Sequence, residues 1–223
     1  METQKKLNKK SYYLISLIII VLIATGIYLY LENRGKFEYK GRLDTFKFNT
    51  YQIGNVEIYR PEVVLKDATG HTYKFIYAFR NQPIDLDNVF MEKDIGKKLQ
   101  GEKVIGIYIS RAPEFSQSIN GSFSLAVAPM ETILGRSDAG IYKKDLRNTY
   151  TSHSKEEPKV DTINCDTINL SVNFDTYFRV IELRLGNENK VYSEGKCIII
   201  EGKDEKGVIA SAEKFAYELI GVF

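Results

Sequence analysis

The feature of this sequence that most constrains its fold is an uncharged run of twenty residues, 12–31, near the start of the chain. A helix of this length rises about 30 Å, which is the thickness of the hydrocarbon core of a bilayer. Amphipathic tyrosine rings, which favour the headgroup level, lie at both ends of the run, at Tyr12, Tyr13, Tyr28 and Tyr30. The run therefore predicts a transmembrane helix, with membrane lipid as a partner.

Two interpretations other than a permanent anchor are possible for this run. A signal peptide would also have a lysine-rich start, and residues 24–26 could form its cleavage site, although its apolar core is usually only about 7–15 residues long. A buried core helix is disfavoured, because soluble helices keep a polar face and this run offers only Ser16 and Thr25. We expect an uncleaved signal-anchor, and cleavage after Gly26 stays open.

The orientation of the helix in the membrane cannot be predicted from charge alone, because the basic residues are equal in number on its two sides. Four lysines precede the run, and four basic residues follow it between Arg34 and Arg42. A short tail is readily retained inside, whereas a long domain is translocated largely regardless of its charge. We therefore expect the N-terminus in the cytoplasm and the bulk of the chain outside. The predicted parts are a lysine-rich tail (1–11), a transmembrane helix (12–31), a charged stalk (32–40) and an exterior domain (41–223) that the polar segment 151–159 could divide into two halves.

The charge of the exterior part argues against nucleic acid as a partner. The tail carries four lysines and Glu2, a net +3, and the whole chain is +2, so the remainder is about −1. A nearly neutral domain lacks the basic surface that phosphate backbones require. A nucleotide is not expected either, because Val208 and Ile209 follow the Gly202–Gly207 loop where a phosphate-binding loop needs Lys and Ser or Thr.

The pattern of the remaining chain predicts strands and two helices. An apolar run at 63–65, turn residues at 67–70 and an aromatic run at 72–79 have the form of a hairpin, whose alternating aromatic side chains face the core. Residues 103–110 predict a further strand. Residues 122–136 are ambiguous, because Phe123, Leu125 and Val127 alternate as in a strand while other apolar residues share one helical face. A helix is favoured over most of the segment, and Pro129 is the main objection to it.

The C-terminal region has the clearest signals. Strands are predicted at 178–185, 191–193 and 197–200, the last as a continuous apolar run typical of a strand buried on both faces. Asp204 is the predicted N-cap of a closing helix that stops at Gly221. Strands that alternate with helices predict an α/β or α+β domain built on a mixed sheet with packed helices.

Two cysteines, Cys165 and Cys197, permit a disulfide if the domain lies outside the cytoplasm. A loop of about 33 residues closed in this way would contribute on the order of 3–4 kcal/mol. Two buried thiols that pack as small apolar groups are the alternative. Asn120 and Asn169 each begin a glycosylation sequon, which an exported domain could use.

No motif predicts a catalytic, cofactor-binding or metal site. His71 lies in a predicted turn, and His153 lies with Glu156 and Glu157 in the solvated segment 151–159. Asp85 and Asp87 could point the same way on a strand and form a carboxylate pair, but a turn-flanking role suits them better. No nucleophile elbow is present in the sequence.

Several short motifs together resemble uncharacterised archaeal membrane-anchored proteins. The motifs are Phe79-Arg80-Asn81-x-Pro83, Cys165, Cys197-Ile-Ile-Ile-x-Gly202 and the alanine-rich helix up to Gly221. The resemblance implies that the two cysteines pair, and it implies no activity or site residue.

These observations lead to three hypotheses. The first is a single-pass membrane protein whose exterior domain binds another protein or a surface component. The second is an extracytoplasmic hydrolase or transferase whose site is assembled from distant residues such as Arg80, Asp85, Asp87 and His153. The third is a small-ligand sensor, which would need a partner helix in the membrane because the predicted tail is only about eleven residues long.

Overall fold

The computed structural model describes residues 9–66, 69–100, 104–112, 120–138, 140–148, 165 and 178–223. The chain divides into two compact units, Met1–Lys36 and Phe37–Phe223. The predicted linker 151–159, with His153, and the sequon at Asn169 lie outside the described residues.

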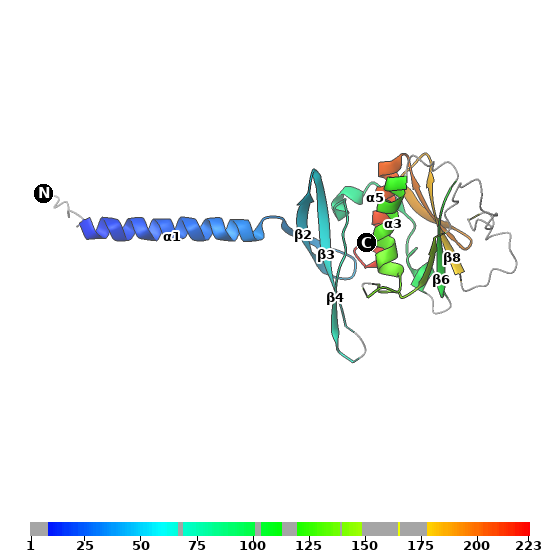
Figure 1. Cartoon of the computed structure of the whole chain (residues 1–223), viewed down its shortest axis with the longest axis horizontal. Helices are drawn as coiled ribbons and strands as arrows, with labels where there is room; N and C mark the ends of the chain where they lie inside the picture. Colours follow the sequence, from blue (N-terminus) through cyan, green and yellow to red (C-terminus); the bar gives the residue numbers. More distant parts are fainter. Residues whose placement is uncertain are drawn as a thin grey trace. The chain divides into compact units, whose positions relative to one another are not determined.

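The first unit contains the N-terminal helix α1 (Lys9–Asn33), drawn in blue in Figure 1. Its 22 residues from Tyr12 to Asn33 are long and apolar enough to cross a membrane, and none of the apolar window is buried by the protein. The predicted apolar helix is therefore confirmed. A signal sequence near the N-terminus would have the same length and composition.

The second unit begins with a four-stranded sheet in the order β1-β2-β3-β4. Its strands are β1 (Lys36–Lys40), β2 (Thr45–Ile53), β3 (Val56–Lys66) and β4 (Thr72–Ile76). The antiparallel β3–β4 pair is the predicted hairpin. The prediction of a stalk over residues 32–40 was wrong for residues 36–40, because Phe37 packs its ring on Phe48 of β2, with 4.7 Å between centroids, and this draws the segment into the sheet.

Proline shapes the β3 strand. The β3–β4 ladder runs from Lys66–Thr72 to Glu62–Ile76, and pairing resumes only at a single bridge between Tyr59 and Phe79. Pro61 lies in the gap, and because it has no N–H it cannot donate to a neighbouring strand. The aromatic residues of β4 and the segment after it consequently pass from exposed Tyr73 to fully buried Phe79 along one face.

A six-stranded mixed sheet forms the other side of the second unit, in the order β5-β9-β10-β8-β6-β7. Its strands are β5 (Phe90–Met91), β6 (Gly106–Arg111), β7 (Asp145–Asn148), β8 (Phe178–Leu185), β9 (Lys190–Glu194) and β10 (Cys197–Gly202). Strand β10 is parallel to β8 and antiparallel to β9. All six residues of β10 are buried, and the first four form the continuous apolar run 197–200 that predicted a strand buried on both faces.

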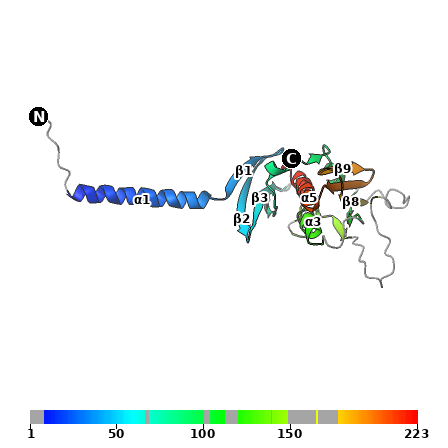
Figure 2. The same cartoon turned by 90° about the horizontal axis from the view of Figure 1, so that it is seen from above.

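Helix α5 (Glu205–Leu219) lies between the two sheets, with α3 (Asn120–Leu134) beside it (Figures 1 and 2). Two short helices, η1 (Pro83–Leu86) and α2 (Lys97–Gln100), precede β6. The predicted α3 forms despite Pro129, because the buried side chains of its inner face, Ala126, Val127, Met130 and Ile133 among them, stabilise it by packing. The structure therefore confirms an apolar N-terminal helix followed by an α+β domain with one mixed sheet.

Contacts of α5 join the two sheets into one unit. The Tyr217 ring stacks on Phe79, with centroids 3.8 Å apart, on the side of the four-stranded sheet. On the side of the mixed sheet, the Ser211 hydroxyl donates to the carbonyl of Glu201 at 2.7 Å. Twelve residues of α5 are buried. Because buried polar groups need hydrogen-bond partners, the polar side chains of α5 form hydrogen bonds with main-chain groups of neighbouring segments.

Candidate functional site

The structure does not bring the predicted carboxylates together as a site. Asp85 lies in η1, not on a strand, and its carboxylate accepts a hydrogen bond from the Gln82 amide at 3.3 Å. Pro83 opens this turn because its fixed φ suits the first helical position. The hypothesis that Asp85 and Asp87 face the same way on a strand is therefore wrong, and the turn-flanking role holds for Asp85; both residues are exposed.

Of the other polar residues considered, His153 lies outside the described residues, and His71 and Arg80 each have a separate partner. The His71 ring lies 2.7 Å from the Thr69 hydroxyl. Arg80 takes part through its main chain, whose N–H donates to the buried Glu213 carboxylate at 2.6 Å. Among the described residues, no group of three or more His, Cys, Asp and Glu side chains could hold a metal ion. The sequon residue Ser122 donates its hydroxyl to Glu205 at the start of α5.

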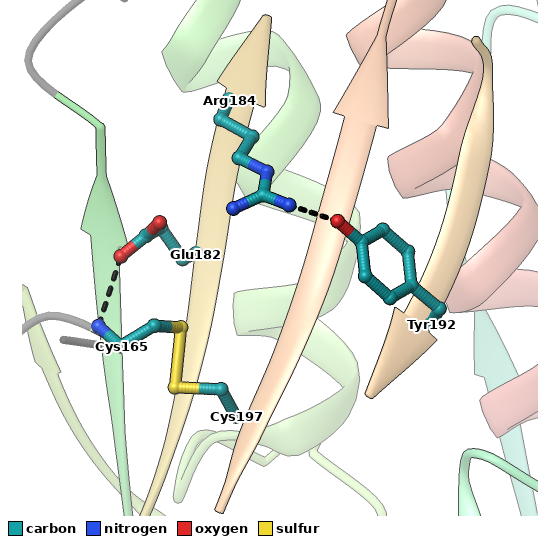
Figure 3. Close-up of a disulfide and its surroundings, with 5 residues drawn as sticks. All are labelled: Cys165, Glu182, Arg184, Tyr192 and Cys197. Carbon is teal, nitrogen blue, oxygen red and sulfur yellow. Dashed lines mark hydrogen bonds between the residues drawn. A yellow bond between two sulfur atoms is a disulfide. The ribbon is translucent and has the colours of Figure 1, made fainter. Parts of the chain in front are cut away.

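The two cysteines form a disulfide on the face of the mixed sheet opposite α5 (Figure 3). The Cα atoms of Cys165 and Cys197 are 5.6 Å apart. The Glu182 carboxylate of β8 accepts a hydrogen bond from the Cys165 amide at 2.9 Å. The predicted pairing is thus confirmed, and disulfides are typical of domains outside the reducing cytoplasm.

A charged network lies next to the disulfide on the same face. Arg184 reaches across β10 to the Tyr192 hydroxyl (Figure 3), and Lys190 and Arg184 each lie 3.4 Å from the Glu201 carboxylate. Burial opposes the charged carboxylate, but Lys190, the Tyr192 hydroxyl and Arg184 together hold the pKa of Glu201 below its usual value. Lys190 also lies 3.4 Å from the Glu188 carboxylate, so the two cations have two carboxylates near them, and the network is best explained as stabilising the sheet.

An unfilled place in the four-stranded sheet is the stronger candidate for a binding site. The antiparallel β2–β3 ladder ends at the pair Lys47–Glu62, although β3 continues to Lys66. Beyond that pair the two strands diverge and leave a hollow between them. We call this hollow the notch, and define it by its lining residues Leu43, Asp44, Thr45, Phe46, Lys47, Glu62, Val63, Val64, Leu65 and Ile220.

The hydrogen-bond pattern shows which main-chain groups face the notch. Tyr59 of β3 exchanges both main-chain hydrogen bonds with Phe79, so the odd-numbered residues of β3 direct their N–H and C=O groups toward the β4 side. The even-numbered residues then direct theirs toward β2. For Val64 and Lys66, which lie beyond the last pair, the β2–β3 ladder supplies no partner among the described residues.

The notch has a volume of about 390 Å³ and an apolar floor. Phe46 and Val63 are buried at its base, while the side chain of Leu43 is 73 % exposed at its edge. Asp44, Lys47 and Glu62 provide polar groups at the rim. An apolar floor beside main-chain groups that have no ladder partner is the surface that an added β-strand requires.

The C-terminal tail explains why β2 leaves β3 at this point. The amides of Arg42 and Leu43 donate to the carbonyls of Val222 and Gly221 at 3.1 and 3.2 Å. Gly221 has a φ of +85°, and a Cβ there would lie 2.4 Å from the Leu43 side chain. Glycine suits this position because its φ would strain a residue with a side chain, and the tail it belongs to holds the entry to β2 beside the notch.

Sequence reasoning missed the notch, since it assigned only residues 63–65 of β3 and none of β2. A signal was present in the alternation of Phe46 and Phe48 with polar residues, followed by the turn residues Gly54 and Asn55. The divergence itself left no local signal, because it depends on a tail that is about 180 residues further along the chain.

No protein-family model, curated protein or solved structure matches this chain. The resemblance to archaeal membrane-anchored proteins therefore stays a prediction.

Proposed function

We propose that this protein is a single-pass membrane protein whose extracytoplasmic domain binds a partner protein. In this proposal α1 is an uncleaved anchor with its N-terminus in the cytoplasm. The partner supplies an extended segment that enters the notch and pairs with β3 as an added strand.

The location is supported by two independent features. The apolar part of α1 has the length of a bilayer core, and the short lysine-rich segment before it suits retention inside. The Cys165–Cys197 disulfide suits an oxidising compartment for the second unit. An anchor near the N-terminus and a disulfide in the domain are both expected of a domain that lies outside the cytoplasm.

The mode of binding rests on one observation: the main-chain groups of Val64 face a notch with an apolar floor, and the β2–β3 ladder of the described residues supplies no partner for Val64 or for Lys66, the next residue directed the same way. A strand is the structure that offers N–H and C=O groups at the spacing of alternate β3 residues. Main-chain pairing would supply affinity, and alternate side chains of the partner would reach the floor at Phe46 and Val63.

The notch also selects the chemistry of the segment. Alternate apolar side chains suit the floor, and a segment without proline is needed at the paired positions because each must offer an N–H. The rim carries charges of both signs, with Glu62 already held by Lys74 at 2.6 Å. The proposed ligand is therefore an extended, proline-free peptide with alternating apolar residues and little net charge.

Peptide selection on the full-length protein in nanodiscs tests this proposal. Displayed random dodecapeptides are selected for binding, and the hits are synthesised with blocked ends and measured by fluorescence anisotropy. We expect alternating apolar peptides that bind the wild-type protein and lose at least tenfold in affinity in a Val64→Pro variant, because proline removes the N–H that faces the notch. The Val64 and Lys66 amides should become protected from hydrogen exchange when peptide is bound.

Thr72→Pro is the matched control. Thr72 pairs with Lys66, an even-numbered residue of β3, so the Thr72 amide faces the outer edge of β4 and not the notch. The Thr72→Pro variant should bind the selected peptides with wild-type affinity. Selected peptides that bind the Val64→Pro variant as well as the wild type would contradict the notch as the site, as would a selection that yields no alternating apolar peptide.

A further inference from the structure

The tip of the β2–β3 hairpin carries an apolar patch that the notch does not use. The pairs Tyr51–Ile58 and Ile53–Val56 are adjacent across the hairpin, so their four side chains share one face. This is the outer face of the sheet, since the neighbouring residues of β2 that point to the core, Phe46 and Phe48, lie in the alternate register. We call these four residues the tip patch.

The tip patch is exposed although its residues are apolar. Tyr51 is 49 % exposed, Ile53 is 68 % exposed and Val56 is 36 % exposed. The hairpin turn does not require them, because Gly54 with a φ of +60° already supplies the conformation of a two-residue turn. Clustered apolar side chains in water mark a surface that meets an apolar phase or another molecule.

Basic side chains lie on the same face as the tip patch: Arg60 is next to it, and Lys47, Lys74 and Lys66 lie further along the strands, toward the notch. Within β2, β3 and β4, the register places four basic residues and one acidic residue on the outer face: Lys47, Arg60, Lys66, Lys74 and Glu62. The guanidinium carbon of Arg60 lies 5.1 Å from the centroid of the Tyr51 ring. Glu62 is paired with Lys74, so the charge left on this face is positive.

The short link between α1 and β1 is a further reason to consider a lipid bilayer as the binding partner of this face. Only Arg34 and Gly35 separate the end of α1 at Asn33 from the start of β1 at Lys36. Three peptide steps span at most about 10 Å, whatever their direction. The first strand of the sheet thus begins close to the end of the helix, and so close to the bilayer surface if α1 is an anchor.

We infer that the outer face of the four-stranded sheet binds the surface of an anionic lipid bilayer. Tyr51, Ile53 and Val56 enter the interface between headgroups and acyl chains, where tyrosine is favoured. Arg60, Lys47 and Lys66 bind lipid phosphates, each charge near the surface contributing to attraction that falls with salt. The inference uses the anchor of the proposed function. It shares Lys47 with the rim of the notch, but its apolar contacts lie at the tip of the hairpin, away from the peptide site.

The chain contains no tryptophan, so a single introduced indole reports its own surroundings. The full-length Tyr51→Trp variant is reconstituted in vesicles of phosphatidylcholine with 30 mol % phosphatidylglycerol, with and without lipids brominated on the acyl chains. We expect a blue-shifted emission and a loss of at least one third of the fluorescence in the brominated vesicles. The loss should be smaller in pure phosphatidylcholine and should decrease in 0.5 M salt.

Tyr73→Trp is the matched control, because Tyr73 is 50 % exposed, nearly the same as Tyr51, but its register places it on the inner face. This variant should show little quenching by brominated lipid. No quenching of the Tyr51→Trp variant, or equal quenching of the two variants, would overturn the inference. Equal quenching with and without phosphatidylglycerol would overturn the role of the basic residues. None of these results depends on whether peptides bind the notch.

Discussion

At the scale of the residue, buried acidic groups show how this protein tolerates charge in its interior. Glu213 is 1 % exposed, and its carboxylate accepts hydrogen bonds from the amides of Arg80 and Asn81 and from the Asn81 side chain. Burial nevertheless raises the pKa of Glu213. Glu201 differs because two cations and a hydroxyl lie around it, and its pKa is lowered. The sign of each shift follows from the balance between lost water and gained partners.

Glu201 gives a prediction for the effect of pH on stability. Since its pKa is lowered in the folded state, the carboxylate stabilises the fold above its unfolded pKa, about 4.3, and this contribution is lost as the pH falls through the lower folded value. We expect a Glu201→Gln variant to be less stable than the wild type at pH 7 and to approach it below pH ~4. Urea unfolding of both proteins from pH 7 to 3 measures the difference. A difference that does not change with pH would contradict the prediction.

At the scale of the element, α5 is the helix whose start the sequence predicts best. Asp204 adopts an extended backbone, and its carboxylate accepts a hydrogen bond from the Gly207 amide at 2.7 Å, as expected of an N-cap. Helical spacing of apolar residues predicted the buried face correctly. The same reasoning could not reveal that nearly every face of α5 is buried, because the second sheet that covers it comes from residues 36–76.

The cap gives a prediction at this scale. An Asp204→Ala variant should lose about 1 kcal/mol of stability, because the Gly207 amide then has no side-chain acceptor. Chemical denaturation followed by circular dichroism measures the loss. Asp204→Asn is the control, since asparagine caps helices as well as aspartate does. Equal losses in the two variants would show that the charge, and not the cap, is what matters.

Other elements could not be predicted from local patterns. The local sequence of residues 36–40 predicted a charged stalk. The segment forms β1 instead, because the rings of Phe37 and Tyr39 pack against those of Phe48 and Phe223 respectively. For Asp85 the less favoured placement on a strand fails, because Pro83 opens a short helix there. In each case a contact or a proline outweighed the local pattern.

At the scale of the whole molecule, the disulfide links a cysteine beside Glu182 of β8 to the first residue of β10. A loop of this size is expected to contribute about 3–4 kcal/mol to the free energy of unfolding. We expect a Cys165→Ala/Cys197→Ala double variant to lose that amount in urea unfolding. Reductant should lower the stability of the wild type to the level of the variant and leave the variant unchanged. A variant as stable as the oxidised wild type would contradict the prediction.

The sequence by itself determined the apolar helix, the order and type of the C-terminal elements and the class of the fold, because length, apolar periodicity and caps act over a few neighbouring residues. It left the pairing of the cysteines and the candidate site open. Only the tertiary structure decided that Cys165 meets Cys197, that residues 36–40 join a sheet, and that β2 and β3 part to form the notch. These features depend on contacts between distant segments, such as Leu43 with Gly221, which no local pattern encodes.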